Sequence, residues 1–213
     1  MALSKVDYNS LNVTAAASKA LKWNSGADGF ETGDIAGALV LLTTETASSD
    51  ATIEFDSNID STYKEYIIKF YDVHPETDVK PLTVNFRDGS TAYDATKQTT
   101  FFYANHDEAD TATSLAYVTG GDLALDTGVQ NVTVNVGNGN DECASGYLHL
   151  FDPSSTTFVK HFMSRSNTYN SDDASYDLFV AGYCNTTSAI DGVQFKFASG
   201  DIDAGTFKLY GVT

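Results

Sequence analysis

Prolines, cysteines and basic residues are few in this sequence, and it has no long hydrophobic run. With 3 prolines and 16 glycines in 213 residues, it is neither collagen-like nor a proline-rich chain of low complexity. Its longest apolar stretch, residues 35–42, is too short to cross a bilayer. The sequence contains no GxSxG, HExxH, P-loop or GxGxxG motif. These absences exclude several common classes of enzyme and predict no catalytic residue.

The shortage of basic residues produces a strongly acidic chain. It has 29 acidic and 12 basic residues, for a formal net charge of -17. Such a surface repels phosphate backbones and anionic lipid headgroups, so we expect neither nucleic-acid binding nor membrane insertion. Acidic charge of this kind keeps a protein soluble in a salty or crowded setting. The alternative is that clustered carboxylates bind calcium.

Only two cysteines, Cys143 and Cys184, are present, and they lack the CxxC spacing of a zinc site. The first 23 residues contain no continuous apolar segment typical of a secretory signal. We therefore expect synthesis in a cytoplasm, without secretion, and reduced thiols that pack as small hydrophobic side chains. A disulfide between the two cysteines formed later is the alternative.

Alternation of apolar and polar residues dominates the chain after residue 37. It is clearest at residues 82–86, 132–136 and 193–197, which is typical of strands with one face in a core and the other in water. Turn-forming residues separate the segments, and no helical crossover is visible. We predict an all-β fold, an antiparallel two-sheet sandwich of jelly-roll type. Further strands are predicted at residues 38–44, 51–55, 64–73, 98–104, 146–151, 157–164, 176–183 and 205–211.

The first part of the chain, residues 1–36, lacks this alternation. We interpret it as a short extended N-terminal attachment arm, with at most a turn or two of helix at residues 15–21, preceding a sandwich domain at residues 37–213. A disordered tail is the alternative. Trp23 is the only tryptophan and lies outside the predicted sandwich, so it is the predicted partner anchor. Residues 107–116 are expected to form a loop with a turn of helix.

Two acidic segments are weak candidates for a calcium site, although we expect no metal. Asp56, Asn58 and Asp60 have the initial ligand spacing of an EF-hand loop, but Ser61 and Ile67 occupy the positions that need glycine and a bidentate glutamate. A turn that connects two strands explains them better. The second segment offers loop oxygens and an imidazole from four neighbouring residues: His106, Asp107, Glu108 and Asp110.

The remaining candidates for function are histidines and tyrosines. His149 and His161 lie in predicted strands, where a structural histidine is more common than a ligand or base. The acidic residues are too numerous for any pair to be singled out as a glycosidase dyad. Tyrosine is frequent, with 12 residues, and its ring suits subunit interfaces, sugar stacking and ordinary core packing alike.

The segment KALKWNSGADGFETGD resembles one that precedes the main domain in bacteriophage fibre and virion proteins, and MALSKV resembles the start of many tail proteins. The body is similar to virion structural proteins of marine tailed bacteriophages. The similarity lies in four segments of the predicted sandwich: residues 52–75, 148–167, 181–197 and 199–212.

This resemblance implies a non-enzymatic virion surface component, such as a tail or head fibre protein that displays a β-sandwich for host attachment. The arm would bind other virion proteins, and the loops would face a host glycan or protein. A capsid decoration protein is the alternative, and a polysaccharide depolymerase is third. Virion appendages are most often trimeric, so a homotrimer is expected. No cofactor and no catalytic residue is implied, with calcium as the one alternative.

Overall fold

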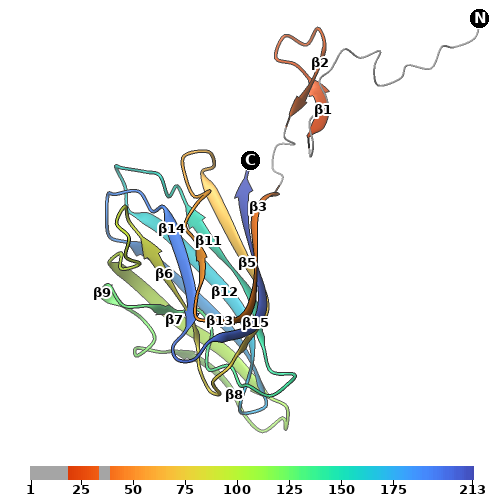
Figure 1. Ribbon diagram of the computed structural model, residues 1–213. Coiled ribbons are helices and arrows are strands. Elements are labelled where there is room, and N and C mark those ends of the chain that lie inside the picture. Colours follow the sequence, from red (N-terminus) through yellow and green to blue (C-terminus); the bar gives the residue numbers. More distant parts are fainter. Residues whose placement is uncertain (1–18, 34–38) are drawn as a thin grey trace, which may run out of the picture. The chain divides into compact units, whose positions relative to one another are not determined.

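The computed structural model of the protein describes residues 19–33 and 39–213, and these residues form strands and turns with no helix. It divides the chain into two compact units, Met1–Leu39 and Val40–Val212 (Figure 1). The predicted all-β class is therefore confirmed. No helix long and apolar enough to span a membrane occurs in the described part of the chain.

Fifteen strands make up the described structure. They are β1 (Ala20–Trp23), β2 (Phe30–Gly33), β3 (Leu39–Asp50), β4 (Ile53–Phe55), β5 (Glu65–Pro75), β6 (Leu82–Arg87), β7 (Lys97–Asp107), β8 (Thr113–Tyr117), β9 (Ala124–Asp126), β10 (Gln130–Asn131), β11 (Ala144–Phe151), β12 (Lys160–Asn170), β13 (Ala174–Cys184), β14 (Gly192–Phe197) and β15 (Ile202–Val212).

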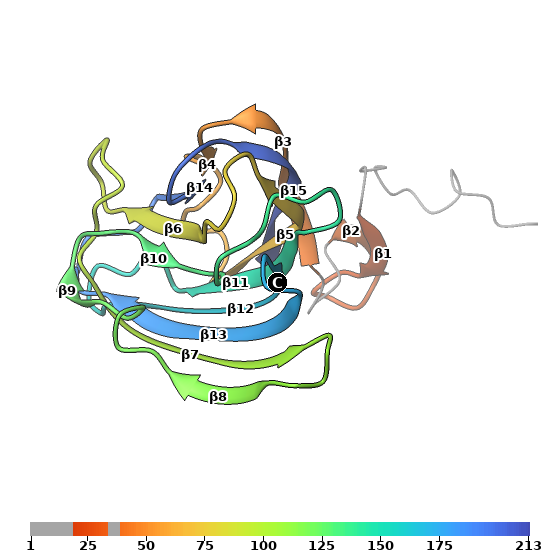
Figure 2. The ribbon, with the colours of Figure 1, turned by 90° about the horizontal axis from the view of Figure 1, so that it is seen from below.

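Two sheets build the second unit. The larger has nine strands in the order β3-β15-β5-β11-β12-β13-β7-β8, with β9 pairing β7 as well. The smaller has four strands in the order β10-β6-β14-β4. Figure 2 shows the four-stranded sheet lying against one face of the curved nine-stranded sheet. The registered strand pairs are antiparallel, which confirms the predicted jelly-roll-like sandwich.

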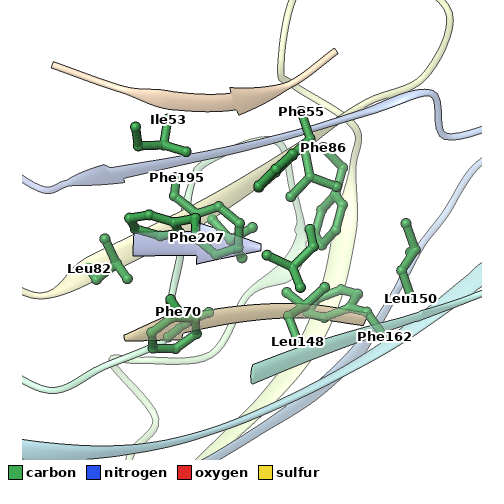
Figure 3. Close-up of a cluster of buried hydrophobic side chains, with 14 of the residues drawn as sticks. Ile53, Phe55, Phe70, Leu82, Phe86, Leu148, Leu150, Phe162, Phe195 and Phe207 are labelled. Atoms are coloured by element: carbon green, nitrogen blue, oxygen red, sulfur yellow. The ribbon is translucent and has the colours of Figure 1, made fainter. Parts of the chain in front are cut away.

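Aromatic rings fill the space between the two sheets (Figure 3). Phe195 from β14 packs against Phe70 of β5 and Phe207 of β15, with ring centroids 6.1 Å and 5.3 Å away. Phe86 of β6 reaches Phe162 of β12 at 4.7 Å. All five rings are fully buried. Burial of this much apolar surface is the main stabilising contribution to the fold.

The prediction that one face of residues 82–86 is in water was wrong. Thr83 and Asn85 are buried together with their apolar neighbours on β6. The Thr83 hydroxyl donates to the backbone oxygen of Lys196 at 2.8 Å. Asn85 donates from Nδ2 to the Thr127 oxygen at 3.1 Å. Hydrogen bonds to the neighbouring strand β14 and to the loop residue Thr127 thus offset the cost of burying these polar groups.

The strand expected at residues 132–136 was also wrong, although Val132 and Val136 are fully buried as its pattern requires. The regular pairing with β6 covers only Gln130 and Asn131. Beyond that point the Thr133 hydroxyl accepts the Leu82 N–H at 2.7 Å, in place of a backbone carbonyl. A side chain therefore interrupts the ladder while the valines still reach the core.

Residues 107–116 were expected to be a loop with a helical turn, and this was wrong as well. The segment begins with a turn in which the Asp107 carboxylate accepts the N–H groups of Thr111 and Ala112, both at 2.8 Å. The chain then reverses into the edge strand β8, which pairs with β7. A polar strand on the outside of a sheet has no buried face, so its apolar periodicity is absent.

The first unit contains a β-hairpin, where an extended arm had been predicted. Strands β1 and β2 pair in register, from Ala20 opposite Gly33 to Trp23 opposite Phe30. Asn24 closes the connection by accepting the Ala27 N–H at its backbone oxygen and the Asp28 N–H at its side chain. The helical turn suggested for residues 15–21 lies partly outside the described residues, and its last two residues are in β1.

Candidate functional site

Asp56, Asn58 and Asp60 are engaged separately and share no common ligand position. The backbone oxygen of Asp56 accepts a bond from Arg87 Nη2 at 2.9 Å, and Asn58 donates to Thr43 Oγ1 at 3.3 Å. The Asp60 carboxylate accepts the Thr62 N–H at 2.7 Å, and hydrogen bonds from the side chain and backbone of Thr62 lower the pKa of Asp60. This geometry is that of a turn between two strands.

The second acidic segment is organised in the same local way. Asp107 holds the turn that precedes β8, and its hydrogen bonds from Thr111 and Ala112 lower its pKa to about 2. His106 Nε2 contacts Asp110 Oδ1 at 3.0 Å, while Glu108 is exposed. No group of three or more His, Cys, Asp or Glu side chains suited to a metal ion occurs within residues 19–33 and 39–213.

Cys143 and Cys184 are both free thiols in the structure. Cys184 is fully buried, and burial raises its pKa to about 12. Cys143 is half-buried, and burial raises its pKa too. Because the thiolate is the reactive form, neither cysteine is activated as a nucleophile.

The predicted anchor, Trp23, lies on one face of the hairpin. Its ring stacks on Phe30 with centroids 4.4 Å apart and planes inclined by 26°. Leu21 follows the same face of β1, and all three side chains are exposed, Trp23 by 60%. Sequence reasoning missed Phe30, because only the strand register places it opposite Trp23. We call this set of Leu21, Trp23 and Phe30 the hairpin face.

A second set of residues, exposed or half-buried, lies on the nine-stranded sheet, on the face that points away from the core. Strand register aligns one residue from each of seven neighbouring strands, β8, β7, β13, β12, β11, β5 and β15. We call this set the outer row. In spatial order it consists of Tyr117, Phe102, Phe179, Arg165, Tyr147, Lys69 and Lys208.

Residues at the centre of the outer row contact one another through ring stacking and a cation–π interaction. Phe102 and Phe179 stack with centroids 4.9 Å apart and planes only 2° from parallel. The Arg165 guanidinium lies 4.7 Å from the Phe179 ring centroid, within cation–π range. Its Nε and Nη2 donate to the two carboxylate oxygens of Asp177 at 2.9 Å and 2.8 Å. This bidentate pair fixes the guanidinium plane and neutralises its charge.

A shallow groove of about 360 Å³ runs beside these rings. Tyr147, His149, Met163 and Phe179 line it, and Met163 is 55% exposed. His149 contacts Tyr147 edge-on, and its Nδ1 lies 2.5 Å from a carboxylate oxygen of Glu65. The histidine expected to be purely structural therefore lies at the groove.

The other strand histidine, His161, is exposed on the same outward face of β12. It contacts Tyr183 with ring centroids 5.9 Å apart. His161 therefore lies on the surface of the sheet, although a histidine with a structural role had been expected at this strand position.

Two lysines end the outer row. Lys69 and Lys208 are directly opposite each other on β5 and β15. The Lys69 ammonium lies 5.6 Å from the Tyr210 ring centroid, and that of Lys208 lies 5.9 Å from the Tyr71 ring centroid. In the described structure, neither ammonium pairs with a carboxylate. Each lysine is thus held by a cation–π contact with a tyrosine ring, and its positive charge is not balanced by a carboxylate.

The outer row joins flat exposed rings to uncompensated positive charge. Rings of this kind bind ligands by stacking, and the ammonium groups attract anions. Tyr147 belongs to the tyrosines that the sequence singled out, whereas Phe102, Phe179 and Lys69 do not. Nothing in the linear sequence signals their alignment, because it depends on the pairing of strands up to about 140 residues apart.

Neither a known protein family, nor a curated protein, nor a solved structure matches this chain.

Proposed function

We propose that the protein is a non-enzymatic component of a bacteriophage virion surface, of the fibre or adhesin type, which displays its β-sandwich for host attachment. The single observation that carries the binding role is the outer row. Its rings lie on an open sheet face, where Phe102 and Tyr147 are each 38% exposed. Exposed aromatic residues gathered in one place are typical of interaction surfaces.

The virion location is supported by the resemblance of the sequence to virion structural proteins. In this proposal the hairpin face, with Trp23 and Phe30, binds other virion proteins. An isolated two-stranded hairpin is marginally stable in water, and an apolar face on it gains stability when a partner covers it. The sandwich remains free to bind a host surface glycan or protein.

A capsid decoration protein is the second candidate. The lack of any internal repeat that could build a shaft within these 213 residues favours this alternative. In a decoration protein the outer row would contact shell subunits, and the hairpin face would contact a neighbouring subunit. A polysaccharide depolymerase is the third candidate, and it requires a carboxylate that acts on the bound chain.

Labelling of purified virions with antibody against the sandwich, viewed by electron microscopy, tests the location. Label on tail or head fibres supports the proposal, and label spread evenly over the capsid supports decoration. Absence of the protein from washed virions contradicts both. Light scattering of the purified full-length protein tests the expected homotrimer, and a monomer at micromolar concentration would contradict it.

Incubation of the pure protein with host surface polysaccharide tests for the third candidate. We expect no new reducing ends. Sustained release of reducing ends, abolished by replacement of a single acidic residue, would establish a depolymerase and contradict the non-enzymatic assignment.

A further inference from the structure

The charge of the outer row runs opposite to that of the whole chain. The chain carries a formal charge of -17. Within the outer row, however, the charged members are Arg165, Lys69 and Lys208, all of them positive. Asp177 neutralises Arg165. The uncompensated positive charge is therefore concentrated on the two lysines at one end of the row.

The lysine pair is arranged to be available to a ligand. Each ammonium lies over a tyrosine ring, that of Tyr210 or Tyr71, and this contact holds the long side chain near the sheet without consuming its charge. The nearby carboxylate of Glu65 is engaged by His149. In a chain with more than twice as many acidic as basic residues, two neighbouring lysines without a carboxylate partner leave their positive charges available to an external anion.

The dimensions of the outer row fit an extended chain rather than a compact ligand. Seven strands spaced about 4.8 Å apart give the row a length of about 29 Å. The spacing of neighbouring strands is also comparable with the length of one sugar residue in an extended polysaccharide. Sugar rings present a flat apolar face that stacks on aromatic side chains, as Phe102 and Tyr147 offer here.

We propose that the outer row binds a linear anionic polysaccharide across the strands. The rings of Tyr147 and Phe102 stack on the sugars, and Lys69 and Lys208 bind a carboxylate or sulfate group of the chain. This inference rests on the proposed attachment function and specifies its ligand. A protein partner or a second copy of this chain are the other possible occupants, and the experiment below distinguishes them.

Native gel electrophoresis of the full-length protein, with a polysaccharide cast in the gel, tests the proposal. Two matched pairs serve as ligands: polygalacturonate with its methyl ester, and cellulose sulfate with hydroxyethyl cellulose. We expect stronger retardation by at least one polyanion than by its neutral counterpart. The acidic protein is repelled by polyanions in general, so retardation requires a local site. Equal retardation within both pairs, or none by either polyanion, would overturn the proposal.

Variants locate the site. Lys69→Gln combined with Lys208→Gln should weaken retardation by the polyanion roughly tenfold, because two charged contacts with the polyanion are lost. Binding to the neutral partner should be unchanged. The matched control, Lys64→Gln with Lys196→Gln, removes the same charge elsewhere and should bind normally. Equal losses in both double variants would assign the binding to net charge and refute the site.

The ring contribution is tested separately. Tyr147→Ala should weaken binding to both members of a pair roughly tenfold, whereas Tyr147→Phe keeps the ring and should retain most of the binding. Thermal unfolding monitored by circular dichroism checks that each variant is folded. Concentration-dependent association that disappears in Tyr147→Ala would show that a second copy covers the row, and would overturn the glycan proposal. These gels need no virion, so they can fail or succeed independently of the virion assignment.

Discussion

The two faces of the nine-stranded sheet carry similar side chains and have opposite surroundings. On the inner face, Phe70 and Phe207 are fully buried against the second sheet. On the outer face, Phe102 and Phe179 stack almost parallel, and Phe102 remains 38% exposed. Both faces are aromatic, so hydrophobicity alone does not distinguish core from surface here. Only the inner rings have a second sheet packed over them.

This difference explains why the outer row is a candidate site. A strand with one wet face usually has apolar residues inward and polar residues outward. β12 departs from this pattern at Ser164 and Ser166, which point inward and bond to backbone oxygens of Tyr147 and Val132, and at Met163, which is exposed. Exposed apolar side chains gathered on one face mark a candidate interaction surface.

Among the substitutions that test this comparison, replacement of an inner ring should have the largest effect on stability. Phe195 is fully buried between Phe70 and Phe207, so Phe195→Ala should lower the free energy of unfolding by about 3–5 kcal/mol. Denaturant unfolding measures this loss. A change below about 1 kcal/mol would show that the space between the sheets is not close-packed.

The contrast between the buried Lys97 and the lysines of the outer row predicts that the free energy of unfolding depends on pH. Lys97 is fully buried, donates to Asn85 Oδ1 at 2.6 Å, and burial lowers its pKa to about 8. The unfolded chain keeps this proton up to pH 10.5, so it binds more protons than the folded state above pH 8, and stability rises with pH there. Cys184, with its pKa raised from 9.0 to about 12, has the opposite effect above pH 9, because the unfolded chain loses this proton before the folded state does.

We therefore expect the free energy of unfolding to increase from pH 8 to pH 9 by somewhat less than about 1 kcal/mol, to level off between pH 9 and pH 10.5, where the two contributions nearly cancel, and then to decrease. Urea unfolding at closely spaced pH values measures the profile. In Lys97→Met the rise should disappear, whatever the absolute stability of that variant. The matched exposed variant, Lys64→Gln, should keep it, and a flat wild-type profile would contradict the assignment to Lys97.

An outer ring should matter less for stability than for binding. Phe102→Ala removes one stacked contact with Phe179 and leaves the core intact, so it should cost only about 1 kcal/mol. The same gels that test Tyr147 should show weaker retardation by polysaccharide. A loss of stability as large as that of Phe195→Ala would mean that the outer row is structural, and that the contrast between the two faces is false.

The smallest effect on stability is expected at the hairpin. Trp23→Ala lies outside the unit Val40–Val212, so the thermal unfolding of the sandwich should not change. Incorporation into virions should decrease strongly if the hairpin face is the attachment surface, because Trp23 and Phe30 are its exposed rings. Immunoblots of purified virions measure this decrease. The control, Lys19→Gln, also in the first unit, should be incorporated normally.

The sequence by itself determined the fold class. Alternation at residues 82–86 and 193–197 placed Val84 and Phe195 in the core, and the absence of helical periodicity excluded a crossover. Apolar alternation depends on local geometry, since successive side chains of a strand point to opposite faces. The sequence also singled out Trp23 as the predicted partner anchor, from its rarity and its position alone.

Only the tertiary structure decided which residues form the proposed binding surface. Tyr147, Arg165 and Phe179 lie side by side because β11, β12 and β13 pair in one particular register. Lys69 meets Lys208 because the C-terminal strand pairs with β5. A shift of one residue would turn each of these side chains to the other face of the sheet. Register is a property of distant segments in contact, so no local pattern in the sequence records it.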